Sequence, residues 1–235
     1  MAVSFDSPYY PFEKVASGVL TFRGAERIPK LIANYLLDLP DAAGYQPIDD
    51  NTRPRVRLMK YLWYDGANPL AKPLPTEKEK LSMVFDGENP VLNTDEEKAK
   101  HPQGYRIFPQ EYWLPAEFWA ATQLKIYMGR TLPYDDFTAE IGVTFDIVVN
   151  YMNDGNLRTD ALSRLYAMEC ALIESLNGVN IAGVGKFCFN RRNHMDDGSH
   201  TFHDDGTNVG RCIGMSLTWA ESDSPKIMPG HELWR

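Results

Sequence analysis

The clearest pattern along the chain is an alternation of apolar and polar residues near its middle. Every second position from Ala139 to Val149 is apolar, and a shorter alternation covers Gln123 to Arg130. The turn-forming sequence Pro133-Tyr-Asp-Asp lies between the two runs. A period of two is typical of a strand with one buried face, and a turn between two such runs favours antiparallel pairing. The pattern therefore predicts a long β-hairpin of residues 123–130 and 137–150.

Two other segments carry apolar residues at the three- and four-residue spacing of an amphipathic helix. The first covers Gly24 to Leu39. The second covers Thr159 to Leu176, with Thr159 or Asp160 as its N-cap and Asn177-Gly178 as its stop signal. The sequence thus predicts two helices, one before and one after the hairpin.

Two more alternating runs follow the second helix. Gly183 to Asn190 and Arg211 to Trp219 predict two strands, and the polar residues Arg191 to Asn208 predict a long hairpin loop between them. The simplest arrangement of these elements is an antiparallel β-sheet with two α-helices packed on one face. We therefore expect a single α+β domain covering residues 1–235.

The remaining segments do not continue these patterns. Residues 40–121 are rich in proline, glycine and aromatic residues and predict a large irregular insertion. Within it, only Arg55 to Trp63, as a strand, and Lys78 to Phe85 indicate regular structure. Residues 1–23 predict an N-terminal arm, which fits either an edge strand or a segment that docks on another surface, and residues 220–235 predict a C-terminal tail.

The composition limits the classes of protein that the chain can represent. Of its 235 residues, 43% are hydrophobic and 24% are charged, as is typical of a folded globular protein. A formal net charge of −8 argues against a general nucleic-acid binder, which needs an excess of Lys and Arg. No run approaches the roughly 18 apolar residues of a membrane span, and the N-terminus has no apolar signal segment. We expect a soluble protein of the cytoplasm.

The chain shows no pattern of a nucleophilic or acid–base catalyst. Its three widely spaced cysteines, which suit buried thiols in a reducing compartment, are Cys170, Cys188 and Cys212. The carboxylate pair Asp135 and Asp136 falls in the predicted hairpin turn, where turn chemistry explains it. Glu169 falls on the apolar side of its helix, where it either lies at a solvated edge or meets an arginine such as Arg164. We predict neither catalytic nor cofactor-binding residues.

The polar loop between the last two strands is the best candidate for a metal site. It holds imidazole and carboxylate groups, which are Asp196, Asp197, His200, His203, Asp204 and Asp205. Their spacing matches no closed zinc motif, and Asp-Asp-Gly is also what tight turns select. We therefore predict no metal, and His200, His203 and Asp204 are the residues that would hold one.

Aromatic residues concentrate in the insertion and indicate a contact surface. Tyr, Trp and Arg are preferred in buried subunit contacts, although aromatic faces also suit sugars and peptides. We predict a subunit interface at Tyr105, Phe108, Tyr112, Trp113, Trp119, Tyr127 and Arg130. The alternative is a non-catalytic ligand- or carbohydrate-binding module whose platform is formed by Trp63, Trp113 and Trp119.

The C-terminal half of the chain, residues 120–220, together with the helix at 24–39, resembles the tail terminator (tail completion) proteins of long-tailed bacteriophages. Members of that family also run helix, strand, strand, helix, strand, strand, with a long antiparallel pair and a closing pair. The likeness is one of topology and pattern and covers about half of the chain.

This resemblance implies a structural virion protein without catalytic activity or cofactor. Tail terminators form a ring, commonly a hexamer, that caps the tail tube and joins it to the head–neck connector. Genomic DNA passes through the lumen of the ring without specific binding, which the acidic balance of this chain fits. The expected partners are further copies of the chain, tail tube proteins and neck proteins, and no membrane. The expected location is the tail or neck of the virion, after assembly in the host bacterial cytoplasm.

Overall fold

The computed structural model describes most of the chain, in ten segments. These are residues 25–39, 47–66, 68–87, 92–110, 122–133, 138–150, 158–181, 184–189, 198–204 and 208–220. The predictions for the N-terminal arm, for Asp135 and Asp136 and for the tail beyond Ala220 lie outside these segments.

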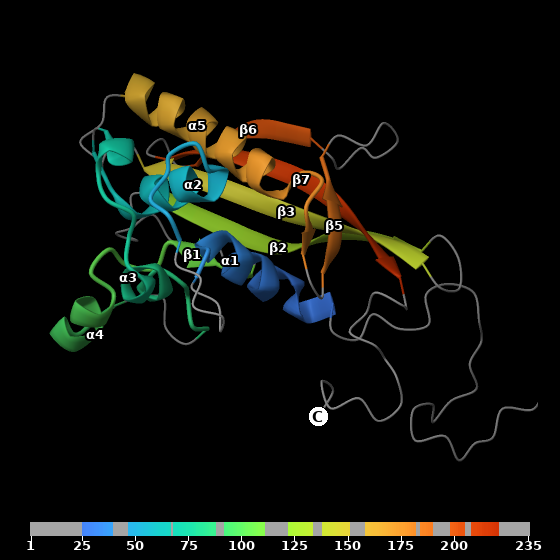
Figure 1. Ribbon diagram of the computed structural model, residues 1–235, viewed down its shortest axis with the longest axis horizontal. Coiled ribbons are helices and arrows are strands. Elements are labelled where there is room, and N and C mark those ends of the chain that lie inside the picture. The colour runs from blue at the N-terminus through green and yellow to red at the C-terminus, as the bar shows by residue number, and fades with distance from the viewer. Residues whose placement is uncertain are drawn as a thin grey trace, which may run out of the picture.

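One curled β-sheet forms the centre of the fold, and its long strands run side by side (Figure 1). The strands are β1 (Ile107–Phe108), β2 (Thr122–Pro133), β3 (Thr138–Asn150), β4 (Asn180–Ile181), β5 (Gly185–Cys188), β6 (Gly198–Asp204) and β7 (Asn208–Ala220). Among the described residues the order is β1-β2-β3-β7-β5-β4, and β6 also pairs with β7. With the helices, this gives the mixed α+β content that the sequence predicts.

The predicted hairpin is confirmed and continues into a third long strand. β2 and β3 pair antiparallel from Thr122↔Val149 to Pro133↔Ala139. β3 pairs antiparallel with β7 over its whole length, from Thr138↔Ala220 to Asn150↔Asn208. The strand predicted at 183–190 is also present, as β5. The alternating sequence pattern succeeded here because one face of each long strand is buried in the core.

A β-bulge between Met128 and Thr131 shifts the register of β2 against β3. At the bulge the Arg130 backbone lies close to Gly142, and a Cβ on that glycine would lie 2.9 Å from the Arg130 carbonyl oxygen. A side chain there would force the backbone to move. Gly142 therefore permits the bulge, which bends the far end of the hairpin.

Both predicted helices are present. α1 (Ile28–Leu37) follows a short 3-10 turn, and Pro29 lies in its first turn. α5 (Arg158–Leu176) is a 19-residue helix. Because α5 begins at Arg158, neither Thr159 nor Asp160 is its N-cap, and this detail of the prediction is wrong.

The segment predicted as a strand at Arg55 to Trp63 is instead a helix, α2 (Pro54–Trp63). Pro54 stands in its first turn, where proline favours helix initiation. The alternation of Val56 and Leu58 misled the prediction, but the spacing of Leu58, Met59 and Leu62 is helical. All four of these apolar side chains are buried, so packing against the sheet decides the structure.

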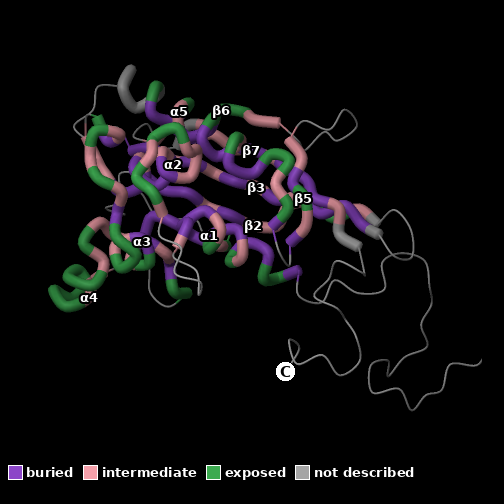
Figure 2. Tube along the Cα trace, viewed as in Figure 1, coloured by how far each residue is buried: buried purple, intermediate pink, exposed green. Residues whose placement is uncertain are grey.

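The hydrophobic core joins the sheet to three helices, α1, α2 and α5. Apolar residues of these helices form one cluster with the inward-facing side chains of β2, β3 and β7. Phe145 belongs to this cluster, and its ring centroid lies 6.5 Å from that of Phe187. In Figure 2 the long strands are coloured mostly as buried, and so are stretches of these helices. Trp63 belongs to the same core, with 5% of its surface exposed.

The loop predicted at Arg191 to Asn208 is wrong in part, because residues 198–204 form the strand β6. This strand pairs antiparallel with the first half of β7, from Gly198↔Gly214 to Asp204↔Asn208. The ring of Phe202 lies over Gly210, where a Cβ would be 2.2 Å from a ring carbon. An aromatic side chain thus covers a glycine of the neighbouring strand and compensates for its missing side chain.

The second half of the insertion contains short, well-capped elements. α3 (Glu77–Ser82) confirms the regular structure predicted within Lys78 to Phe85, and α4 (Asp95–Lys100) follows it. Both begin with a capping box, in which a threonine and a glutamate three residues later satisfy each other's backbone N–H groups. A 3-10 turn, η2 (Pro69–Ala71), precedes them.

Candidate functional site

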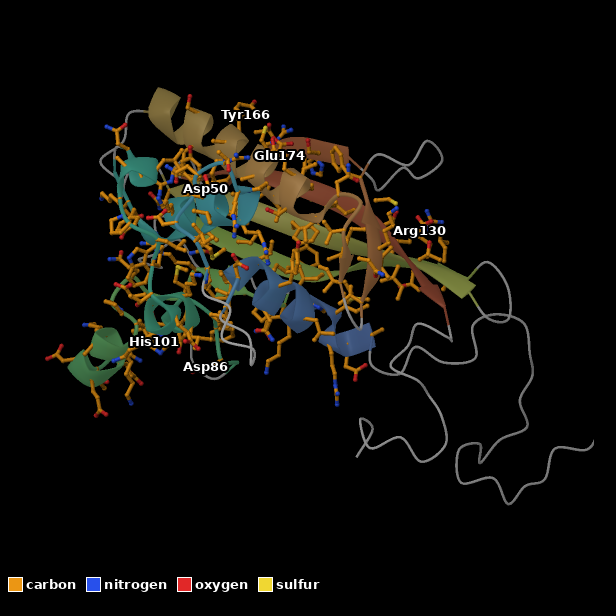
Figure 3. The ribbon with its side chains drawn as sticks, viewed as in Figure 1. Asp50, Asp86, His101, Arg130, Tyr166 and Glu174 are labelled. Atoms are coloured by element: carbon orange, nitrogen blue, oxygen red, sulfur yellow. The ribbon has the colours of Figure 1, made fainter. Side chains whose placement is uncertain are left out.

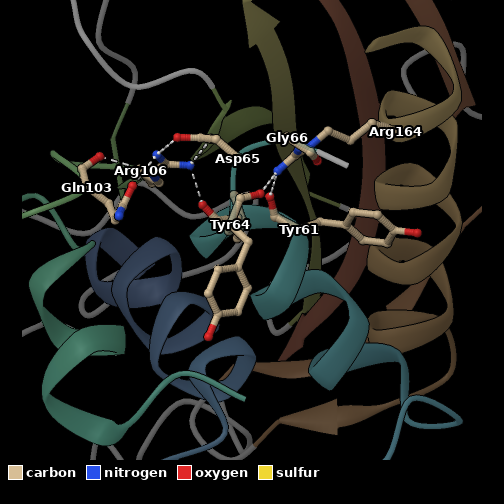
Figure 4. A network of polar contacts seen from close by, with 8 residues as sticks. Tyr61, Tyr64, Asp65, Gly66, Gln103, Arg106 and Arg164 are labelled. Atoms are coloured by element: carbon tan, nitrogen blue, oxygen red, sulfur yellow. Dashed lines mark hydrogen bonds and ion pairs between the residues drawn. The ribbon is translucent and has the colours of Figure 1, made fainter. Parts of the chain in front are cut away.

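A buried arginine, Arg106, connects the second half of the insertion to the end of α2. Its guanidinium donates two hydrogen bonds to the carboxylate of Asp65, at 2.8 and 2.6 Å. It also donates to the carbonyl oxygens of Leu62 at 2.7 Å and Gln103 at 3.0 Å (Figure 4). Only 1% of the surface of Arg106 is exposed. The planar guanidinium group therefore donates hydrogen bonds to the carbonyl end of a helix and to a carboxylate at the same time.

A second arginine, Arg164 of α5, reaches the same helix end from the other side. It donates hydrogen bonds to the carbonyl oxygens of Tyr61 at 2.5 Å, Gly66 at 3.4 Å and Tyr64. The last carbonyls of a helix have no partner within the helix and carry partial negative charge. Arg106 and Arg164, which we call the arginine clamp, supply the missing donors and fix α2 between the second half of the insertion and α5 (Figure 4).

Glu169 meets an arginine, but its partner is Arg211 of β7 and not Arg164. The two side chains form a bidentate ion pair with distances of 2.8 and 2.7 Å, and both are largely buried. Arg211 also donates to Ser199 and Thr201 of β6. The hydrogen bonds that Arg211 donates to the Glu169 carboxylate raise the pKa of the guanidinium. The expected solvated edge position for Glu169 is therefore wrong, and the pair fastens α5 to the β6–β7 hairpin.

The face of the sheet opposite the core cluster carries a row of polar side chains. Lys125, Asp146, Cys212 and His200 stand opposite one another across β2, β3, β7 and β6. The hydroxyl of Tyr127 donates to Asp146 at 2.9 Å. Burial raises the pKa of the Cys212 thiol to about 12, and the carboxylate of Asp146 adds to this rise. We call this row the polar face.

The three cysteines were expected to be buried, and this expectation is wrong. Cys170 is exposed on α5, whereas Cys188 and Cys212 are half-buried, and all three are free. Because α5 packs with one side only, a cysteine on its outer side faces solvent. Exposure and pKa together set how fast each thiol reacts.

We expect Cys170 to be alkylated by iodoacetamide at least ~100-fold faster than Cys212 at a pH of about 8, because a pKa near 12 leaves roughly one thiolate in ten thousand. Peptide mass spectrometry after timed labelling measures both rates. Asp146→Asn should raise the Cys212 rate, since it removes the charge that disfavours the thiolate. Equal labelling of both cysteines in the native protein would contradict the expectation.

The far end of the long strands forms a projection that we call the strand extension, made of Met128–Pro133 of β2 and the facing residues of β3. It reaches beyond the helices (Figure 1). Arg130 and Thr131 are exposed there, and Leu132 is half-exposed. Figure 3 places Arg130 at this end, away from Tyr166 and Glu174 on α5.

The structure separates the aromatic residues predicted to form an interface. Tyr105 and Phe108 are buried with Phe85 in a small cluster inside the chain, so their rings are not available to a partner here. The hydroxyl of Tyr105 donates to Asp86 at 2.9 Å. Tyr127 lies on the polar face and Arg130 on the strand extension. The remaining three, Tyr112, Trp113 and Trp119, lie outside the described residues.

The residues that would hold a metal do not gather into a site within the described segments. No group of three His, Cys, Asp or Glu side chains there is placed to bind an ion. His200 is exposed on β6, and His203 and Asp204 belong to the same strand, although their side chains lie outside the described part. Trp63, one of the three residues of the alternative ligand platform, is a core residue.

The fold and these contacts define an α+β protein built on three long antiparallel strands and a buried arginine clamp. The model of the YomW family matches residues 56–209. The chain therefore belongs to the YomW family, a phage-associated Bacillus protein family. A comparison with curated proteins finds no match. Within the described segments, no helix combines the length and apolar character needed to cross a membrane.

Proposed function

We propose that the chain is a structural virion protein of the tail-terminator or neck type, acting as one subunit of a closed ring. Membership of a phage-associated family supports a role in a phage particle. The succession of a helix, a long antiparallel pair, a second helix and a closing pair supports the tail-terminator type. The proposed ring, a hexamer, caps the tail tube and joins it to the neck, with DNA passing through its lumen.

The observation that carries the proposal is the strand extension. In the strand extension β2 is the edge strand of the sheet, because β3 also pairs with β7 there, and edge strands promote association in solution. A head-to-tail contact with a neighbouring subunit covers such a projection, and repetition by rotation closes a ring. The proposal places α1 and α5 on one face of the sheet, as in the terminator plan. It requires no catalytic residue, metal or cofactor.

The test is the mass of the purified protein by light scattering behind a sizing column, with and without tail tube protein. We expect a ring-sized species in at least one of these conditions. Thr131→Glu adds a charge to the strand extension and should weaken assembly at least ~10-fold, because an unpaired charge in an interface is costly.

Asn34→Glu is the matched control, because Asn34 is exposed on α1 and gains the same charge away from the strand extension. It should assemble like the unmodified chain. A strict monomer that ignores tube protein would contradict the ring and favour the non-catalytic binding module.

A further inference from the structure

The strand β6 lies beside β7 at one edge of the sheet (Figure 1). In the described part of the chain it pairs with β7 and with no other strand. One row of its backbone N–H and C=O groups therefore points away from the sheet. His200 and Thr201, in the middle of the strand, are exposed. β6 thus offers a row of hydrogen-bonding groups to a further strand.

Side chains of β6 and β7 hold β6 in its extended conformation. The guanidinium of Arg211 donates hydrogen bonds to Thr201 at 2.9 Å and to Ser199, and Arg211 is itself fixed by its ion pair with Glu169. On the other face of the sheet, the ring of Phe202 packs over a glycine of β7. Because the strand is already ordered, it loses little conformational entropy when a partner strand binds.

The edge of β6 lacks the features with which natural proteins discourage pairing between edge strands. Such features are lysines, prolines and β-bulges. Residues 198–204, Gly-Ser-His-Thr-Phe-His-Asp, contain neither lysine nor proline. Their register with β7 is continuous, without a bulge. An edge strand of this kind accepts a further strand through main-chain hydrogen bonds.

The other long edge of the described sheet is β2. β1 pairs with it at Leu124 and Lys125, and beyond these residues β2 pairs on one side only, with β3. This part of β2 includes the strand extension. Its bulge and Arg130 discourage unselective pairing there, so the edge suits one specific partner. β4, at the remaining edge, has two residues and is too short for an extended contact.

The strand directions allow the two long edges to pair between copies of the chain. β2 runs antiparallel to β3, β3 to β7 and β7 to β6, so β2 and β6 point in opposite directions. Rotation about a ring axis that runs along the strands keeps these directions from one copy to the next. β6 of one copy then meets β2 of the next in antiparallel orientation, which is the more stable type of pairing.

The charges of the two strands are opposite in sign. From Met128 to Pro133 the only charged residue is Arg130, and between Gly198 and Asp204 the only one is Asp204. The chain as a whole carries a formal net charge of −8, so its copies repel each other over most of their surfaces. A contact between these two strands avoids that repulsion and favours β2 against β6 over two β6 strands.

We propose that the edge of β6 receives the strand extension of the next copy as an antiparallel strand, an inference that rests on the proposed ring. Main-chain hydrogen bonds then join the sheets of neighbouring copies. Each copy uses its two long edges in two different contacts, as a head-to-tail ring requires. Closure of the ring pairs both edges in every copy.

A continuous sheet also fixes which side chains face each other across the contact. Thr131 lies on the core face of the sheet, because it stands opposite Ile141. Ser199 and Thr201 lie on the same face by their register with β7. His200, between them, points to the polar face. Thr131 of one copy therefore lies on the same side of the joined sheet as Ser199 and Thr201 of the next.

The test is a disulfide bridge between Thr131→Cys and a single cysteine on β6, in a chain that also carries Cys170→Ser. Ser199→Cys and Thr201→Cys place the second thiol on the core face. His200→Cys is the matched control, because it is as exposed as Thr201 but points to the other face. β3 and β7 separate β2 from β6, so the bridge forms only between chains. The chains are oxidised with and without tail tube protein and run on non-reducing gels.

We expect a ladder of covalent multimers for at least one core-face pair, at least ~10-fold above the His200→Cys control, because a disulfide needs Cβ atoms within about 4.5 Å. Equal yields on the two faces, or no bridge at either core-face position, overturn the inference. A dimer of equal yield from Thr201→Cys without Thr131→Cys also overturns it, since two β6 edges would then pair with each other.

Light scattering on the same samples separates this inference from the proposed function. A ring-sized species without the bridge leaves the ring intact and removes the strand pairing. A covalent ladder without any ring-sized species supports the strand pairing and removes the closed ring.

Discussion

Replacing Arg106 by methionine is expected to lower the free energy of unfolding by about 2–3 kcal/mol, because a buried acceptor that loses its donor costs about 1–3 kcal/mol, whereas Asp65, whose side chain is 36% exposed, stays partly solvated. Methionine fills a similar volume but donates no hydrogen bond. The carbonyl oxygens of Leu62 and Gln103 would then be buried without their donor, and Asp65 would lose its bidentate partner. Urea denaturation followed by circular dichroism measures the change.

Arg106→Lys tests whether the guanidinium geometry or the positive charge of Arg106 stabilises the fold. Lysine keeps the charge but cannot donate hydrogen bonds to Asp65 and two carbonyl groups in one plane. The free energy of unfolding should therefore fall by less than in Arg106→Met. Lys100→Met is the control, because Lys100 forms an exposed pair with Glu96. It should not change stability measurably. If Arg106→Met proves as stable as the control, water replaces the lost donors and Arg106 has no structural role.

The long strands were predictable because burial of one face imposes a two-residue period on the sequence. β6 was missed for the opposite reason. Between Gly198 and Asp204 the only large apolar residue is Phe202, and the strand depends on its pairing with β7 and on Arg211. Such support comes from residues distant in the sequence, which a local pattern does not show.

Local sequence patterns also do not predict the arginine clamp. Arg106 and Asp65 are 41 positions apart, and Arg164 and Gly66 are 98 positions apart. A signal was nevertheless present, because Arg106 stands between the apolar residues Tyr105 and Ile107. An arginine in an apolar segment needs buried acceptors, and the end of a nearby helix supplies them.

Two residues of the predicted interface, Tyr105 and Phe108, pack inside the chain, because aromatic composition does not distinguish an internal cluster from a subunit contact. Tyr105 and Phe108 stabilise the insertion itself. Among the described residues the strand extension is a surface exposed to partners, and the sequence shows it only as a turn-flanked strand end. Its role in assembly is tested by the ring experiment.

The ion pair of Glu169 and Arg211 yields the second large expected effect. Arg211→Met should lower the free energy of unfolding by about 3 kcal/mol, because it leaves Glu169 buried without its partner. The double variant Glu169→Leu/Arg211→Met should recover stability to within about 1 kcal/mol of the unmodified chain, since apolar side chains of similar volume replace a buried pair at little cost. Denaturant titration of the two single variants and the double variant measures the coupling between the side chains.

Hydrogen exchange then separates the role of the pair in stability from its role in placing the β6–β7 hairpin. Arg211 also donates to Ser199 and Thr201, and the double variant restores neither bond. We therefore expect the amides of β6 to exchange faster in the double variant, while those of β3 keep the protection of the unmodified chain. Unchanged protection in β6 would show that its pairing with β7 is sufficient. The role of Arg211 would then be limited to holding α5 through Glu169.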